Sequence, residues 1–292
     1  MDEEMEREMP PPTGPLAARL KGQNAARLDG QSNQAFYRNL EEAIDVRRET
    51  QMVYSLVDVD HQRRNTVDFS SNDLLSLGSN GIMAAEYLAE LSRHPGFPTT
   101  SGGSRIVDGS YAYLEAAEKE IAAFHGYEAG LIFNSGYDAN VGIWTGIPRP
   151  GDVILYDEAS HMSTIDGISG SLAAHRVEFR HNDIESFREA LELILSSNPL
   201  VKRGKRCVLV AVEAIYSMDG DVCPLQEMVD IARDLSQQQG NVQFVVDEAY
   251  STGVVGRDGK GFVCELGLEK DIAIILHSFA KGMASHGGKI LI

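Results

Sequence analysis

The chain has 292 residues, of which 43% are hydrophobic and 24% are charged, and its formal net charge is −17. This balance is ordinary for a globular protein of one large or two modest domains. The acidic excess argues against a general nucleic-acid-binding surface, which needs clustered Lys and Arg. No run of 18 apolar residues occurs, so no membrane span is expected.

The first 66 residues differ in composition from the rest. Residues 1–32 are acidic and then proline-rich, which predicts a flexible leader. They contain neither the apolar segment of a secretion signal nor the basic character of a transit peptide. Residues 33–66 are expected to form an N-terminal helix, at about 34–50, and a connecting segment.

The cysteines favour a reducing compartment. Cys207, Cys223 and Cys264 are widely spaced and form no CxxC pair, which is typical of unpaired thiols. We therefore expect a cytoplasmic protein, with a peroxisomal address still open if the natural C-terminus lies further on.

From Val67 onward, short apolar runs alternate with helix-like segments. The helical patterns at 113–124 and from Pro224 to near Gly240 each carry an apolar face. Continuous apolar strands between helices predict a mostly parallel sheet that is covered on both faces. The predicted strands are 129–133, 153–156, 208–212, 242–246 and 272–276.

Polar residues with chemical potential follow these strands, and ligands gather at the carboxyl ends of such sheets. Ser135-Gly136-Tyr137 opens a helix-like segment, so it is either a phosphate site or an ordinary helix cap. His161 could stack on a flat ring or act as a structural donor. Asp219-Gly220-Asp221 lacks the further carboxylates of a calcium loop, so a turn with Ser217 as a polar contact is expected and no metal site.

Asp247 and Lys281 follow the last two strands and indicate imine chemistry. A lysine forms Schiff bases with pyridoxal phosphate (PLP), and an aspartate can keep the cofactor's ring nitrogen protonated. The alternative for these two residues alone is a strand-end carboxylate and a surface lysine. The other strand ends favour the PLP site.

Seven short motifs, in order along the chain, resemble those of the α-oxoamine synthase family of PLP-dependent acyltransferases, which includes 8-amino-7-oxononanoate synthase. The similarity extends from about Val67 to Ile292. The motifs are Phe69-Ser70-Ser71-Asn72-Asp73-Leu74-Leu75, Ser101-Gly102-Gly103-Ser104-Arg105, Asn134-Ser135-Gly136-Tyr137, Ser160-His161, Glu213 to Asp221, Val246-Asp247-Glu248-Ala249 and Ser278-Phe279-Ala280-Lys281.

The resemblance implies roles around the cofactor ring. Lys281 would form the Schiff base and carry the substrate's α-proton, Asp247 would pair with the pyridine nitrogen, and His161 would stack on the ring. Glu213 would support the ring face of the site, and Ser217 would hydrogen-bond the cofactor.

The resemblance also implies contacts to the phosphate and the substrate. Gly136 and Tyr137 would meet the phosphate and ring, Ser278 would bind the phosphate, and Asn72 would lie near the amino-acid substrate.

Two residues depart from the family pattern. Tyr250 stands where the family usually has a histidine that contacts the cofactor's phenolic oxygen, and a tyrosine hydroxyl can still donate there. Lys289 places a charge in a strand that is expected to be buried. The family also continues beyond Ile292, so residues 67–292 are expected to be an incomplete large domain without the small C-terminal domain.

The fold implied is α/β, the type I PLP-dependent transferase (aspartate-aminotransferase-like) fold. The implied reaction is decarboxylative condensation of a small amino acid with an acyl-CoA or acyl-carrier thioester, in a homodimer. An aminotransferase or lyase of the same fold, and a catalytically silent fragment that only dimerises, are the alternatives. The sequence does not identify the amino acid, the acyl chain or the pathway.

Overall fold

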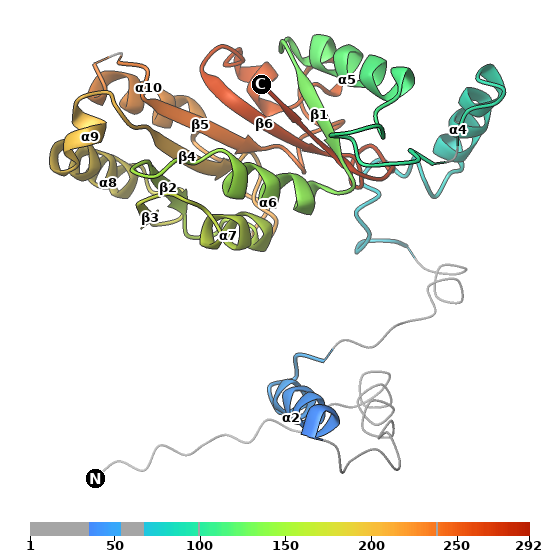
Figure 1. Ribbon diagram of the computed structural model, residues 1–292, viewed down its shortest axis with the longest axis horizontal. Coiled ribbons are helices and arrows are strands. Elements are labelled where there is room, and N and C mark those ends of the chain that lie inside the picture. The colour runs from blue at the N-terminus through green and yellow to red at the C-terminus, as the bar shows by residue number, and fades with distance from the viewer. Residues whose placement is uncertain (1–34, 54–66, 99, 238) are drawn as a thin grey trace. The chain divides into compact units, whose positions relative to one another are not determined.

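The apolar segments that follow residue 129 form the strands of one sheet (Figure 1). The computed structural model describes residues 35–53, 67–98, 100–237 and 239–292, so the predicted leader at 1–32 lies outside the described residues. The described strands are β1 (Gly130–Phe133), β2 (Val153–Asp157), β3 (His175–Phe179), β4 (Val208–Glu213), β5 (Val242–Asp247), β6 (Ile272–Ser278) and β7 (Gly288–Leu291).

The strand order is β1-β7-β6-β5-β4-β2-β3. The pairs from β3 to β6 are parallel, as the sequence predicts. β7 runs antiparallel to both of its neighbours, β1 and β6. The carboxyl ends of β2, β4, β5 and β6 therefore meet at one edge of the sheet, where a ligand site is expected.

The sheet is covered on both faces because its central strands are apolar at nearly every position. In β4, Val208, Val210 and Val212 face one core with helices α8 and α10, whereas Leu209 and Ala211 face a second core with α6 and α7. This alternation is the period of two of a β-strand, here with both faces buried.

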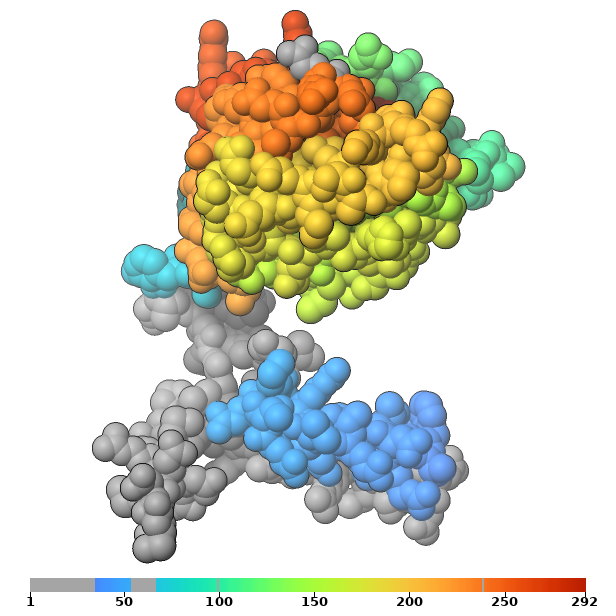
Figure 2. Space-filling view, turned by 90° about the vertical axis from the view of Figure 1, so that its left-hand side faces the viewer, coloured from blue at the N-terminus to red at the C-terminus, as the bar shows by residue number. Residues whose placement is uncertain are grey.

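The helices lie between the strands in the chain. Figure 2 looks onto the side formed by α8 and α9, shown in yellow, and by the later orange segments. In the described ranges, none of the helices is both long enough and apolar enough to cross a bilayer. The helices are α4 (Ile82–Arg93), α5 (Ala112–His125), α6 (Gly136–Gly146), α7 (Met162–Ser169), α8 (Ile184–Ser197), α9 (Pro199–Lys202), α10 (Leu225–Leu235), the 3-10 turn η1 (Arg257–Gly259) and α11 (Phe262–Leu266).

The chain divides into two units, residues 1–69 and residues 70–292. The first contains α2 (Ala35–Glu49), a helix where the sequence predicts one. None of the α2 residues is buried. The second unit contains the whole described sheet.

Lys289 is fully buried in β7, as expected from its position in the sequence. Its Nζ donates a hydrogen bond of 2.5 Å to the backbone oxygen of Glu118. The Glu118 carboxylate receives two hydrogen bonds from Arg105, at 2.7 and 2.9 Å. Burial lowers the pKa of Lys289 to about 8, although the nearby Glu118 charge acts in the opposite direction. The lysine is thus accommodated by the Glu118 backbone oxygen in α5 and by the nearby Glu118 charge.

Gly130 in β1 provides the space for this lysine. A methyl group at Gly130 would overlap Lys289 Cε and would lie 2.8 Å from Leu291 Cδ2. A side chain at position 130 and a long side chain at position 289 therefore compete for the same volume.

Gly130→Ala is expected to destabilise the protein by about 1–3 kcal/mol, the usual cost of overpacking a core. In a Lys289→Ala background the same change should cost less than half as much, because most of the overlap is gone. Urea unfolding of the four proteins in a double-mutant cycle measures this coupling. Equal costs in both backgrounds would contradict the assignment of Gly130 as the space for Lys289.

Candidate active site

A cavity of about 210 Å³ lies at the carboxyl ends of the central strands. A larger hollow of about 670 Å³ lies between α8 and α10, but its charged side chains, Glu189, Glu192 and Lys202, are all exposed. The smaller cavity is the one lined by side chains that are suited to catalysis. Seven residues predicted from the sequence line it: Gly136, Tyr137, His161, Glu213, Asp247, Ser278 and Lys281.

Lys281 has the environment of a lysine nucleophile. Burial lowers the pKa of its ammonium, even though the charges of Asp247 and Glu213 act to raise it. Its Nζ lies 3.3 Å from the centroid of the Tyr250 ring, a cation–π contact in the charged form. A lowered pKa increases the fraction of neutral amine, which is the form that attacks a carbonyl group.

Glu213 and Asp247 are direct register partners at the ends of β4 and β5. Both are buried, at 5% and 9% exposure. Burial, and secondly the charge of Asp247, raises the pKa of Glu213 to about 8. The shift favours the protonated form of Glu213 beside Asp247.

Asp247 is held in place by two donors. Its Oδ2 accepts a hydrogen bond of 2.8 Å from Asn140 Nδ2 in α6, and its Oδ1 accepts one of 2.9 Å from the Ala249 amide. Asn140 also donates to Ser163 Oγ at 3.0 Å. The carboxylate thus has a fixed orientation and lone pairs left for a ligand.

His161 is positioned from both its backbone and its ring. Its amide donates to Glu213 Oε1 at 2.5 Å, and its Nδ1 lies 2.7 Å from Ser163 Oγ. A continuous chain of contacts therefore connects His161 through Ser163 and Asn140 to Asp247. The Tyr137 ring stands edge-on to the imidazole, with 6.3 Å between the centroids.

The N-terminus of α6 forms a cradle for an anion. Ser135 caps the helix by accepting from the Asp138 amide at 3.0 Å. A Cβ at Gly136 would lie 3.2 Å from Ser278 Cβ, and a Cβ at Gly288 would lie 2.6 Å from the Gly136 nitrogen. These glycines keep the backbone close to the Ser278 hydroxyl, and a helix N-terminus favours a phosphate.

Three predicted site residues, Asn72, Ser217 and Tyr250, are absent from the cavity lining. Tyr250 touches Lys281, and its hydroxyl is 3.4 Å from Asn72 Oδ1. Burial, followed by the charges of Glu213 and Asp247, raises the pKa of Tyr250, so its hydroxyl stays a donor.

Ser217 lies at the tip of the 214–223 hairpin, the β-hairpin that follows β4 and is closed by the Ile215–Val222 bridge. The Asp219-Gly220-Asp221 segment forms a turn in this hairpin, as predicted.

Sequence reasoning missed Asn140, Ser163 and His286, all of which line the cavity. Asn140 and Ser163 lie inside helices rather than directly after strands, so the strand-end criterion did not select them. His286 precedes Gly287 in the turn before β7, and its ring is exposed.

The residues of the cavity suit PLP. An ionised Asp247 can pair with a protonated ring nitrogen, Lys281 supplies the amine for the aldehyde, and the α6 N-terminus with Ser278 supplies donors for the phosphate. Asp247, Ser278 and α6 lie on elements that pack in the core, and Lys281 lies in the turn three residues after β6 ends.

Residues 64–292 match the aminotransferase class I and II family. The chain is 49% identical to aminoacyl transferase sphA of Byssochlamys spectabilis over 276 residues, covering 94% of this chain and 58% of that protein. It is 47% identical to 8-amino-7-oxononanoate synthase of Emericella nidulans, covering 78% of this chain and 55% of that protein. A solved structure named SPT with PLP internal aldimine has a TM-score of 0.69 and 26% identity, and covers 88% of this chain and 64% of that one.

The chain thus spans a little over half the length of the curated relatives it matches. The resemblance to α-oxoamine synthases and the type I PLP-dependent transferase fold, both predicted from the motifs, are confirmed by these matches.

Glu213→Gln tests the protonation of this carboxyl. An acid whose pKa is raised on folding loses stability as pH rises from its unfolded value, near 4.5, to its folded value, about 8. Gln resembles the protonated form and does not titrate. In the ligand-free protein, the variant should therefore gain stability relative to wild type across this window, by at most about 1.4 kcal/mol per pH unit. Urea unfolding between pH 5 and 9 measures the difference, and parallel curves would contradict the assignment.

Proposed function

Because the chain belongs to the aminotransferase class I and II family, we propose that it acts with PLP in the decarboxylative condensation of a small amino acid with an acyl thioester. The observation that carries the proposal is the cavity in which a half-buried Lys281 with a lowered pKa and a fixed, buried Asp247 lie together. The names of the relatives, an aminoacyl transferase and an oxononanoate synthase, support acyl transfer over amino transfer.

When bound, PLP would supply an electron-withdrawing ring that stabilises negative charge on the substrate's α-carbon. Asp247 would keep the ring nitrogen protonated, and the hydrogen bonds from Asn140 and Ala249 would prevent the carboxylate from turning away. His161 would pack against the ring face, oriented by Ser163 and by Glu213.

Lys281 would hold the cofactor through its amine and then move the proton of the substrate α-carbon. Tyr250 would hold the lysine side chain against its ring and present a neutral hydroxyl near the reacting end of the cofactor. The α-oxoamine synthases that the motifs resemble usually have a histidine at this position. Asn72, next to the Tyr250 hydroxyl, would contact the amino acid.

The raised pKa of Glu213 has a specific consequence for this chemistry. A protonated Glu213 would leave Asp247 as the carboxylate that pairs with a cationic ring nitrogen. An ionised Glu213 would raise the pKa of Lys281 and reduce its neutral fraction.

The test is product analysis of this chain with PLP, glycine, alanine or serine, and an acyl-CoA. The expected outcome is release of CO2 with formation of an α-amino ketone. Asp247→Asn is the control, and it should fold and retain PLP but lose at least about a hundredfold in rate, or roughly 3 kcal/mol of transition-state stabilisation. Conversion of the amino acid to its keto acid would favour an aminotransferase. PLP binding with no reaction would favour the silent-fragment alternative.

We also propose a homodimer. Residues near the start of the second unit expose large apolar side chains, with Ile106 and Val107 at 92% and 80% exposure and Tyr87 and Leu88 above 60%. A second copy of the chain would cover such side chains, since exposed apolar groups of this size mark association surfaces. Sedimentation velocity should show a dimer that dissociates when Ile106 and Val107 are both changed to Ser. A monomer at every concentration would refute the proposal.

A further inference from the structure

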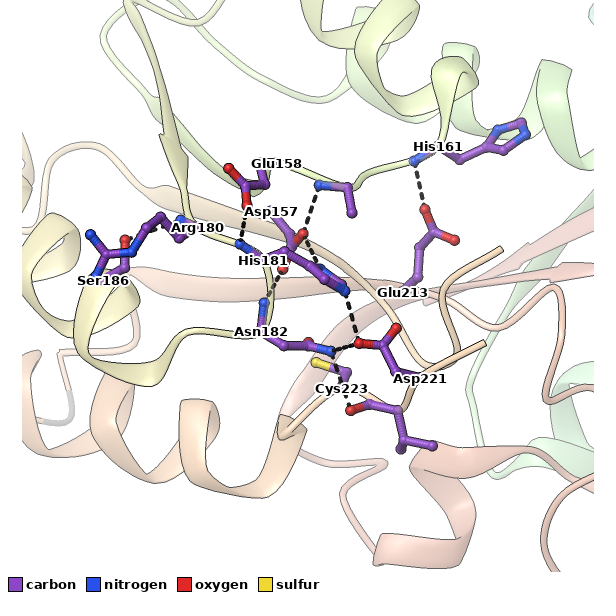
Figure 3. Close-up of polar contacts among 12 residues, drawn as sticks. Asp157, Glu158, His161, Arg180, His181, Asn182, Ser186, Glu213, Asp221 and Cys223 are labelled. Atoms are coloured by element: carbon purple, nitrogen blue, oxygen red, sulfur yellow. Dashed lines mark hydrogen bonds and ion pairs between the residues drawn. The ribbon is translucent and has the colours of Figure 1, made fainter. Parts of the chain in front are cut away.

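The loops that follow β2, β3 and β4 meet at His181, outside the cavity (Figure 3). His181 Nδ1 lies 2.8 Å from Asp157 Oδ1, and His181 Nε2 lies 2.9 Å from Asp221 Oδ2. Each ring nitrogen faces a carboxylate oxygen, an arrangement that favours the imidazolium form, in which both nitrogens donate. One imidazole therefore connects two carboxylates from different loops.

The arrangement is buried on one side. Asp157 is fully buried and also accepts hydrogen bonds from the Ala159 and Asn182 amides, at 2.8 and 2.9 Å. In the part of the chain that the structure describes, His181 is the only cationic side chain that contacts Asp157 or Asp221. A buried carboxylate is costly without such a partner, so Asp157 depends on the histidine.

The two carboxylates belong to the loop that positions His161 and to the hairpin that follows Glu213. The Asp157 side chain holds the Ala159 amide, and two residues later the amide of His161 binds Glu213. Asp221 lies in the 214–223 hairpin, where its backbone oxygen accepts from the Tyr216 amide and fixes the turn that carries Ser217.

We propose that His181 is a positioning residue that clamps the His161 loop (residues 157–161) to the 214–223 hairpin, and so sets the position of His161 in the cavity. The contacts of His181 with Asp157 and Asp221 support the clamp itself. Its effect on cofactor binding rests on the proposed function. The cluster touches neither the cavity nor the reacting atoms, so its role is indirect.

The charges around His181 make the clamp sensitive to pH. Burial alone lowers the pKa of the imidazole, but the hydrogen bonds and charges of Asp157 and Asp221 outweigh it and raise the pKa above the ordinary 6.5. The stabilisation is therefore complete below pH 6.5 and is lost as pH rises through the raised value. The titratable groups that face His181 or flank it are Asp157, Glu158, Arg180, Asp183, Tyr216, Asp221 and Cys223.

His181→Gln weakens the clamp, because a neutral amide replaces the imidazole that contacts both carboxylates, and the Asn182 hydrogen bonds to Asp157 and Asp221 remain between the two loops. His175→Gln is the matched control, since His175 is exposed at the start of β3. The first variant should speed hydrogen–deuterium exchange in both residues 157–161 and the 214–223 hairpin. It should weaken PLP binding about tenfold, as expected for lost hydrogen bonds between charged groups. The control should change neither.

The melting temperature provides a readout that simple loss of packing would not reproduce. The difference between wild type and His181→Gln should be largest near pH 6 and should shrink as pH rises toward 9. A difference that does not change with pH, or exchange identical to that of the control, would overturn the proposal. If the wild-type chain bound no PLP, the proposed function would fail, and the exchange and melting measurements would still decide the clamp.

Asp221→Asn keeps the proposal testable if His181→Gln does not fold. The Asp221 side chain is 43% exposed, and the change leaves the buried Asp157–His181 pair intact. Exchange should rise in the 214–223 hairpin and stay unchanged in residues 157–161. Unchanged exchange in the hairpin would contradict the clamp.

Discussion

The enforced proximity of two buried carboxyls, Glu213 and Asp247, is the constraint on which the site depends. They are opposite one another because β4 and β5 pair in register to their last residues. Two ionised carboxylates side by side and buried from water are unfavourable, so burial and the charge of Asp247 raise the pKa of Glu213 to about 8. The site is therefore suited to a cationic ring nitrogen or ammonium group.

The other polar groups of the cavity follow from that constraint. A protonated Glu213 still accepts the His161 amide, which draws the loop after β2 toward the loop after β4. Asp247 is in turn oriented by Asn140 from α6, and α6 begins at the cradle beside Ser278. The same helix thus fixes the carboxylate at one end of the cavity and offers its N-terminus to a phosphate at the other. His181 extends this connectivity one layer outward, by joining the same two loops through a second pair of carboxylates.

The central strands and their chemical termini were predictable because β4, β5 and β6 are apolar at nearly every position and end in Glu213, Asp247 and Ser278. β3 was not predicted, since His175, Arg176 and Glu178 make it polar and it pairs only with β2 in the sheet. The insertion of β7 antiparallel between β1 and β6 is a tertiary choice that no local pattern reveals. Asn140 and Ser163 were invisible for a similar reason, because their roles depend on how α6 and α7 pack over the strand ends.

The most direct test of the account is covalent mapping of the cofactor. PLP is added to the 292-residue chain, the imine is reduced with borohydride, and the modified peptide is identified by mass spectrometry. The account predicts one pyridoxyl group per chain, on Lys281, the lysine that combines a lowered pKa with a place in the cavity lining. Trapping on Lys289 or Lys260 instead, with Lys281 unmodified, would contradict the assignment of this cavity as the cofactor site.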